Sequence, residues 1–268
     1  MRLVPFLLFI GFCIPAAVAT GESRSIAAQQ AICTAVESPQ RDAKNVARDI
    51  YRHPIETLTF FGVTPAQTVV EAWPGGGWYA EILAPLLRDR GKYIAAAPPG
   101  KAHDALVALF AKDTKRFGKA VVTTLQIGKA SDIAPAGSAD VVLTFRNVHN
   151  FLKAGDAASA RFFADCYRAL KPGGVLGVVD HRLPENADSS LQIPSGYIKR
   201  STIVRLAIAA GFKFDGESAV NANPRDDHMH PKGVWTLPPS YALGDVDRAK
   251  YQAIGESDRL TLRFVKPR

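Results

Sequence analysis

The stretch Thr68-Val69-Val70-Glu71-Ala72-Trp73-Pro74-Gly75-Gly76-Gly77-Trp78 decides the fold of this chain. It starts as a run of β-branched residues, ends on an acid and breaks into three consecutive glycines, and an apolar helical pattern follows over 79–87. Glycines let the backbone approach a ligand closely, and the first turn of a helix offers unpaired N–H groups. Strand, glycine turn and helix in this order are typical of the first unit of a nucleotide-binding α/β sheet.

Strands and helices alternate outward from this stretch. Strands are expected at 68–73, 92–97, 120–126, 139–145, 174–181, 212–220 and 259–266. Helices are expected at 77–89, 101–117, 156–171 and 197–210. The alternation predicts a three-layer, Rossmann-like α/β domain with a mainly parallel seven-stranded sheet, in which 68–73 is central. The last two strands lack a crossover helix, so we expect the last strand to run antiparallel.

The first 19 residues have the pattern of a secretory signal peptide. Arg2 gives a positive start, residues 3–18 are apolar, and Ala17-Val18-Ala19 is a small-residue cleavage site. A permanent membrane anchor would need about 20 apolar residues. We therefore expect a mature chain that begins near Thr20, has no membrane span, and is periplasmic or secreted.

The remaining chain is expected to form one domain. Residues 20–40 are small and polar and are interpreted as a flexible lead, and 41–268 as a single domain with helices at 41–53 and 54–61. A polar excursion containing proline and tryptophan occupies 221–257. The sequence leaves the oligomeric state open.

Charge and cysteine content restrict the possible partners. The net charge of +8 is spread along the chain without a block of like charges, so no nucleic-acid partner is expected. Cys13 falls in the signal peptide. Cys33 and Cys166 could form a disulfide in an oxidising compartment, or Cys166 could be a small buried hydrophobe among its aromatic neighbours.

Four segments resemble the class I S-adenosylmethionine-dependent methyltransferases. They are 71–77 (an acidic strand end followed by glycines), 139–150 (the fourth strand and its loop), 170–180 (Leu-Lys-Pro-Gly-Gly and the fifth strand) and 209–212 (the entry to the sixth strand). Together with the signal peptide, they make the chain similar to the exported, predicted-methyltransferase branch of that family. The resemblance implies methyl transfer to an unidentified small molecule or envelope component.

The resemblance also implies S-adenosylmethionine as the cofactor. The residues that would bind it are Glu71, Pro74, Gly75, Gly76, Gly77, Trp78 and Asn147. Two positions differ from the family's pattern: Trp73 replaces the first motif glycine, and Ala97 replaces the acid that would accept the ribose hydroxyls. These differences favour an alternative function, a non-catalytic or repurposed methyltransferase-like protein that binds another ligand in the same cleft.

A nicotinamide-binding domain is the other interpretation of the glycine turn, because Gly75–Ala80 also satisfies G-x-G-x-x-A. That site needs an acid about 20 residues later, at the end of the second strand, to hold the ribose. The second strand ends in Ala-Ala-Ala-Pro-Pro over 95–99, without an acid. Glu71 instead precedes the glycines, as in methyltransferases.

The candidate catalytic residues follow the fourth and fifth strands. His149 follows the fourth strand, and Asp180 and His181 follow the fifth, so the three should meet at the carboxyl edge of the sheet. Either histidine could act as a base, with Asp180 orienting it; alternatively, Asp180 and His181 could brace each other structurally. The acids and histidines over 226–230 match no standard metal motif, and no metal site is expected.

Overall fold

The structure is a computed structural model that describes the backbone of residues 16–268 and the side chains of residues 23–268. The expected signal peptide, and Cys13 within it, therefore lie outside the described residues except for 16–19. The strands are β1 (Thr68–Ala72), β2 (Lys92–Ala97), β3 (Val121–Thr124), β4 (Ala139–Phe145), β5 (Leu170–Leu183), β6 (Ile198–Lys199), β7 (Lys213–Glu217), β8 (Pro231–Val234) and β9 (Arg259–Val265).

The helices lie between these strands and at the N-terminal end. They are α1 (Ala16–Val36), α2 (Ala43–Val46), α3 (Asp49–Arg52), α4 (Pro54–Phe60), α5 (Ala80–Leu87), α6 (Lys101–Lys112), α7 (Thr114–Phe117), α8 (Val148–Lys153), α9 (Asp156–Ala169), α10 (Gln192–Ser195), α11 (Arg200–Ala209) and α12 (Arg248–Ile254), with a short 3-10 helix at Ser189–Leu191.

The sheet confirms the expected architecture. Seven strands pair in the order β3-β2-β1-β4-β5-β9-β7, and the two-residue β6 pairs with β5 outside this path. Strands β3, β2, β1, β4 and β5 are parallel, so their carboxyl ends meet at one edge. Strand β9 runs antiparallel to both β5 and β7, as predicted for the last strand.

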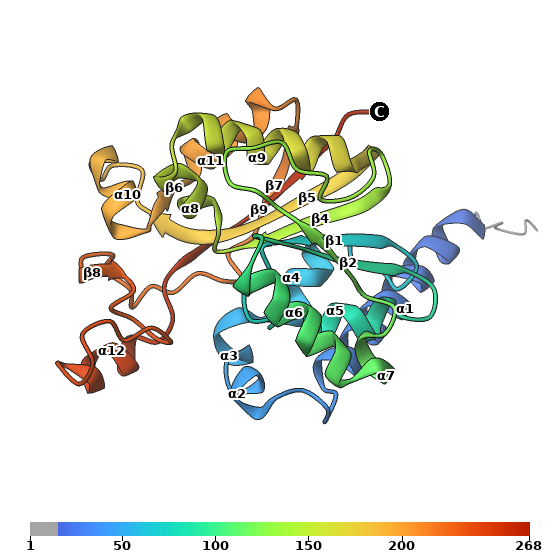
Figure 1. Ribbon diagram of the computed structural model, residues 1–268, viewed down its shortest axis with the longest axis horizontal. Helices are drawn as coiled ribbons and strands as arrows, with labels where there is room; N and C mark the ends of the chain where they lie inside the picture. The colour runs from blue at the N-terminus through green and yellow to red at the C-terminus, as the bar shows by residue number, and fades with distance from the viewer. Residues whose placement is uncertain (1–15) are drawn as a thin grey trace, which may run out of the picture.

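Helices cover both faces of the sheet (Figure 1): α8, α9 and α11 lie on one face, and α1, α4, α5, α6 and α7 lie on the other. Consecutive residues of β1 point to opposite cores. Val70 packs with Phe151 and Phe162 on the first face, whereas Val69 packs with Leu83 on the second. Burial on both faces explains the continuous apolar runs of the parallel strands.

The N-terminal lead differs from the prediction. Residues 20–36 belong to helix α1, which packs against α4 and α5. Ile32, Ala35 and Val36 are buried, and their i, i+3, i+4 spacing places them on one helical face. This short apolar stripe anchors a segment whose overall composition is small and polar, so composition alone wrongly predicts a flexible lead.

Two predicted helices are interrupted. The helix expected at 41–53 consists of the short helices α2 and α3, and the one expected at 101–117 stops at Lys112 and restarts at Thr114. The side chain of Asp113 accepts a hydrogen bond from the backbone N–H of Arg116 and caps the new helix. An internal capping residue thus divides a continuous helical pattern.

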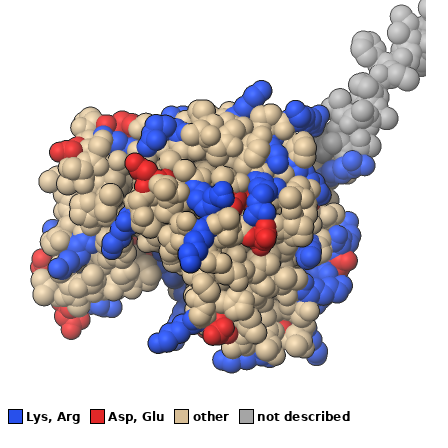
Figure 2. Space-filling model, turned by 45° about the horizontal axis from the view of Figure 1, so that its top comes forward, with Lys and Arg blue, Asp and Glu red and all other residues tan. Residues whose placement is uncertain are grey.

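The structure also shows the distribution of charge on the surface and the positions of the two cysteines. Figure 2 shows Lys and Arg spread over the visible face, without a single block. None of the helices in the described part of the chain is long and apolar enough to cross a membrane. Cys33 and Cys166 are not bonded to each other and lie in α1 and α9, on opposite faces of the sheet. Burial raises the pKa of the Cys166 thiol well above its ordinary value.

Candidate active site

The turn after β1 is held by the loop after β4. Trp73 has a left-handed backbone conformation with φ 60°. The side-chain amide nitrogen of Asn147 donates to the carbonyls of Ala72 (3.1 Å) and Trp73 (3.0 Å). Asn147, expected to bind the cofactor, therefore also fixes the backbone that would approach it.

The glycines after Trp73 have two different roles. A Cβ added to Gly75 or Gly76 would meet no atom within 4 Å, so these two residues leave open space beside the backbone. Gly77 has φ 84°, and a Cβ there would lie 2.8 Å from Leu109 Cδ2. Gly77 is required for close packing against α6, whereas Gly75 and Gly76 leave an open cradle beside the turn.

A cavity of about 180 Å³ opens over this cradle, and we call it the turn cavity. It is lined by Asn45, Arg48, Arg52, Glu71, Trp73, Pro74, Gly75, Gly76, Trp78, Tyr79, Phe145, Arg146 and Asn147. Six of the seven residues expected to bind the cofactor are among them. Gly77 is the exception.

Glu71 lies at the base of the turn cavity and is 2% exposed. Its Oε2 accepts a hydrogen bond of 2.6 Å from the Tyr93 hydroxyl. Burial raises the pKa of Glu71 to about 7, against the opposing effects of that hydrogen bond and of Arg52. A bound cation would favour the carboxylate form, since an opposite charge nearby stabilises the ionised acid.

Both tryptophans near the turn make structural contacts. The Trp73 indole packs edge-on against Phe151, with ring centroids 5.6 Å apart, although it still forms part of the cavity wall. Trp78 Nε1 donates to the carbonyl of Asn45 (2.9 Å), and the Arg52 guanidinium lies 4.5 Å from the Trp78 ring. Trp78 therefore ties the segment containing α2 and α3 to the turn.

The residues fit one end of S-adenosylmethionine better than the other. The cradle at Gly75 and Gly76 and the carboxylate of Glu71 suit the methionine end, whose ammonium group is a cation. At the end of β2, Ala97 is 1% exposed and its carbonyl accepts from the Leu125 N–H. Strand β2 thus presents no carboxylate to the ribose.

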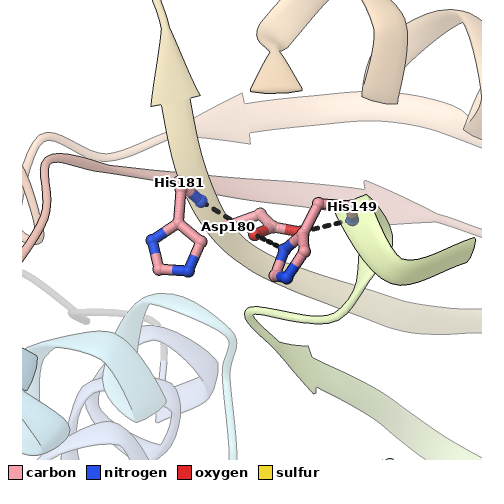
Figure 3. Close-up of side chains that lie close together, drawn as sticks. All are labelled: His149, Asp180 and His181. Atoms are coloured by element: carbon pink, nitrogen blue, oxygen red, sulfur yellow. Dashed lines mark hydrogen bonds and ion pairs between the residues drawn. The ribbon is translucent and has the colours of Figure 1, made fainter. Parts of the chain in front are cut away.

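The three expected catalytic residues lie together (Figure 3). Asp180 is fully buried and accepts from His149 Nδ1 (2.9 Å) and from the backbone N–H groups of His149 (3.1 Å) and His181 (2.8 Å). The two imidazole rings lie side by side, with centroids 5.2 Å apart. The loop after β4 and the end of β5 bring them together because these strands are neighbours.

The hydrogen-bond partner of His149 defines the tautomer of its neutral ring. An ionised carboxylate only accepts hydrogen bonds, so the proton of neutral His149 lies on Nδ1 and the lone pair on Nε2. His181 Nδ1 pairs with the Ser257 hydroxyl at 2.5 Å. Burial, His149 and Arg146 lower the pKa of His181 well below its ordinary value, which keeps this ring neutral.

A second cavity of about 190 Å³, which we call the histidine cavity, lies in front of these rings. Its lining residues are Arg146, His149, Asn150, His181, Val234, Trp235, Pro238, Pro239 and Ser240. Arg146 lines this cavity and the turn cavity as well, so the two sites are adjacent. The excursion at 221–257 supplies the apolar wall with Trp235 and the two prolines.

The acids and histidines over 226–230 organise the excursion. Asp226 is 3% exposed and accepts from the Tyr197 hydroxyl, from the backbone N–H groups of His228 and Asp258, and from His230 Nε2. These donors satisfy both carboxylate oxygens within the protein. The hydrogen bonds of Asp226 therefore stabilise the conformation of the excursion.

Sequence reasoning missed three arginines that line the turn cavity. Arg146 directly precedes Asn147 in the loop after β4, so its place at the carboxyl edge of the sheet was a usable signal. Arg48 and Arg52 come from the N-terminal segment, where no pattern indicates that α3 folds over the turn.

Comparisons with known proteins also indicate a similarity to methyltransferases. Residues 74–178 match the family described as methyltransferase domain. No curated protein sequence shows significant similarity to the chain. Among solved structures, a SAM-dependent methyltransferase from Aquifex aeolicus is 13% identical, with 88% of this chain and 97% of that one covered and a TM-score of 0.57.

Two further solved structures share the fold. The cyclase SpnF is 13% identical over 92% of this chain and 95% of its own, with a TM-score of 0.59. The CurJ carbon methyltransferase is 12% identical over 96% of this chain and 72% of its own, with a TM-score of 0.51. Residues 74–178 therefore match the methyltransferase-domain family, and the whole chain has the fold of these methyltransferases.

Proposed function

We propose that the protein transfers a methyl group from S-adenosylmethionine to a small molecule, or to an envelope component, bound in the histidine cavity. The observation that carries this proposal is the position of Arg146, which lines both cavities. The glycine turn and His149 therefore border adjacent cavities at the carboxyl edge of the sheet, where ligands of open α/β sheets bind.

In this proposal the chain positions two molecules. The cofactor, when bound, supplies a methyl group on a positively charged sulfur. Gly75 and Gly76 give it room beside the backbone, and the Glu71 carboxylate pairs with its ammonium group. Trp235 and the neighbouring prolines hold the acceptor from the opposite side, which favours an oriented approach of the acceptor atom.

His149 is the residue we assign as the general base. Asp180 holds its Nδ1–H, so Nε2 can take a proton from the acceptor as the new bond forms. With an acceptor in hand, His149→Gln should lower kcat by about 10²–10⁴-fold, the usual contribution of a positioned base. The affinity for S-adenosylhomocysteine should stay the same, because His149 does not line the turn cavity.

The deciding experiment is calorimetric titration of residues 20–268 with S-adenosylmethionine and S-adenosylhomocysteine. We expect both to bind. Gly76→Val should block binding without unfolding the chain, since the added side chain enters open space. Ala111→Leu, on the exposed surface of α6, serves as the matched control. Failure of both ligands to bind at millimolar concentration to folded wild-type protein would overturn the proposal.

A second candidate is a repurposed methyltransferase-like protein that binds another ligand. Trp73 in the turn and Ala97 at the end of β2 favour it, because both remove features of an ordinary cofactor site. The similarity to SpnF, which is described as a cyclase, shows that this fold is not restricted to one reaction. The titration separates the two candidates.

We also propose that the protein is exported and cleaved near Thr20. The described buried contacts of α1 lie at Ile32, Ala35 and Val36, downstream of that position. Their packing therefore does not require the first 19 residues. N-terminal sequencing of the protein from a periplasmic or culture fraction should begin near Thr20, and an intact Met1 in the cytosolic fraction would contradict export.

A further inference from the structure

Arginines from two distant parts of the chain converge on the turn cavity. Arg48 and Arg52 lie at the two ends of α3, and Arg146 follows β4. Arg146 has φ 61°, and its backbone N–H donates to the Val179 carbonyl at 2.6 Å. A left-handed conformation is unfavourable for a side chain of this size, so the fold holds Arg146 at this point against a local cost.

The protein satisfies these guanidinium groups only in part. Glu256 pairs with Arg48 Nε (2.6 Å) and Arg259 Nη2 (2.8 Å), and more distantly with Arg52 Nε (3.4 Å). The Nη2 atoms of Arg48 and Arg52 are buried without a hydrogen-bond partner among the described residues. A buried donor without a partner is costly, and a ligand that supplies an acceptor removes that cost.

Arg146 differs from the other arginines of the group because its guanidinium has no protein partner in the described part of the chain. Its guanidinium forms neither a hydrogen bond nor an ion pair with any residue that the structure describes. Burial and Arg259 lower the pKa of Arg146 to about 10, although Glu256 acts in the opposite direction. This cation thus lies at the junction of the two cavities without a protein partner of its own.

The charges around the junction leave an excess of cations. Four guanidinium groups, those of Arg48, Arg52, Arg146 and Arg259, face the carboxylates of Glu71, Asp180 and Glu256. Glu71 is only partly ionised at neutral pH because its pKa is about 7, and burial lowers the pKa of Arg52 to about 8, which reduces the excess without removing it. His181 is kept neutral and adds no charge. An anionic group would restore the balance and fill the free donors, most strongly as a bidentate partner.

We propose that the methyl acceptor is an acid with an apolar body, whose carboxylate or phosphate group is held by Arg146 together with Arg52. This inference rests on the proposed function and names its substrate class. The apolar body would lie in the histidine cavity against Trp235, Pro238 and Pro239. His149 faces the same space, with its ring edge-on to Trp235 at 6.1 Å between centroids. Arg146 would thus orient the acceptor toward both the base and the methyl group.

The test uses residues 20–268 saturated with S-adenosylhomocysteine and three probes: benzoate, acetate and inorganic phosphate. We expect benzoate to bind, and to bind more tightly than acetate because it also covers the apolar wall. Phosphate should compete with benzoate. Arg146→Asn should weaken benzoate binding at least tenfold, and asparagine tolerates the left-handed backbone. Arg146→Lys should retain part of the affinity.

The matched control is Arg200→Asn. Arg200 is a partly exposed arginine of α11 that is paired with Glu217 and lines neither cavity, so its replacement should leave benzoate binding unchanged. Absence of binding by benzoate and phosphate, or equal binding by wild type and Arg146→Asn, would overturn the proposal. It would also be overturned if benzoate competed with S-adenosylhomocysteine but not with methylthioadenosine, which lacks the amino-acid part. In that case the arginines hold the carboxylate of the cofactor.

Separate titrations distinguish this inference from the proposed function. If benzoate binds through Arg146 while S-adenosylhomocysteine does not bind, the anion site is supported and methyl transfer is the part that fails. If S-adenosylhomocysteine binds and none of the anions does, the methyltransferase remains and the acidic acceptor is excluded.

Discussion

Trp73 has an unfavourable backbone conformation, whereas its side chain packs favourably against Phe151. Its φ of 60° suits glycine, so Trp73→Gly should recover about 1–2 kcal/mol of backbone strain. Loss of a buried aromatic side chain costs about 3–5 kcal/mol, and this half-buried indole should be at the lower limit. We expect a net loss of about 1–2 kcal/mol in the free energy of unfolding, measured by denaturant titration.

The affinity of Trp73→Gly for S-adenosylhomocysteine separates packing from occlusion. Because the indole packs against Phe151, we expect the affinity to stay within about threefold of wild type. Phe151→Leu weakens the same aromatic contact without changing the turn and is the control for stability. Markedly tighter binding by a stable Trp73→Gly protein would mean that the natural indole occupies cofactor space.

Glu71 should make stability and binding depend on pH. Its pKa rises from 4.5 to about 7 on folding, so the folded state binds the proton more tightly. The stabilising effect is therefore complete below pH 4.5 and is lost as the pH rises to 7, by about 3 kcal/mol. Glu71→Gln should remove this slope and be more stable than wild type at pH 8.

The same variant should bind S-adenosylhomocysteine more weakly and without a pH dependence near 7, because the ammonium group loses its anionic partner. Tyr93→Phe is the matched comparison. It removes a hydrogen bond that lowers the pKa of Glu71, so the transition should move to higher pH. Equal stability slopes for wild type and Glu71→Gln between pH 4.5 and 7 would disprove this role.

At the scale of elements, the local patterns predict the sheet well. The apolar run at 139–145 matches β4 residue for residue, and the pattern at 92–97 matches β2. The glycine at 91 lies against backbone oxygens, where a Cβ would be only 2.4 Å from the Gln67 carbonyl. The apolar runs and the glycine before β2 are visible in the local sequence, without knowledge of the contacts that they make in the fold.

The N-terminal helices could not be placed in the same way. Helix α3 has four residues, and its position depends on Glu256, more than 200 residues later in the chain. Arg48 and Arg52 are held beside the turn by this long-range ion pair, together with the contacts that Trp78 makes with the same segment. Spacing along the sequence carries no information about such a contact. The positions of Arg48 and Arg52 in the lining of the turn cavity were therefore not predicted.

Glu256 should therefore control the attachment of the N-terminal segment. Burial alone would raise the pKa of Glu256, but Arg259, Arg52 and Arg48 outweigh it and hold the pKa at about 2. A carboxyl with a lowered pKa stabilises the fold above pH 4.5, and this contribution is lost as the pH falls to 2. At pH 7, Glu256→Gln should destabilise the protein by about 3 kcal/mol.

Limited proteolysis is the measurement that localises this effect. Glu256→Gln should expose the segment containing α2 and α3 to cleavage before the rest of the domain unfolds. Glu217→Gln removes a carboxylate from an exposed ion pair and should change stability by less than about 1 kcal/mol. If the two variants have equal stability and equal cleavage of this segment at pH 7, the ion pairs of Glu256 do not hold Arg48 and Arg52 over the turn cavity.

At the scale of the whole molecule, the candidate site is assembled at one edge of the sheet. The meeting of His149 with Asp180 was predictable, since parallel neighbouring strands end at the same edge. The third side of the cleft comes from the excursion, whose Trp235 and prolines have no periodic pattern. Its position follows from tertiary contacts such as the one between Tyr197 and Asp226. The sequence thus predicts the site residues at the carboxyl edge of the sheet better than those that the excursion contributes.

The same architecture determines the chemistry of the two cysteines. Cys33 is partly exposed in α1, whereas Cys166 is fully buried in α9 and burial raises the pKa of its thiol. The sheet lies between the two helices, so a disulfide would require the fold to open. For residues 20–268 we expect Cys33 to react with a thiol reagent in native buffer and Cys166 to react only in denaturant. The single variants Cys33→Ser and Cys166→Ser assign the two reactions, and loss of both thiols in protein purified without reductant would contradict the prediction.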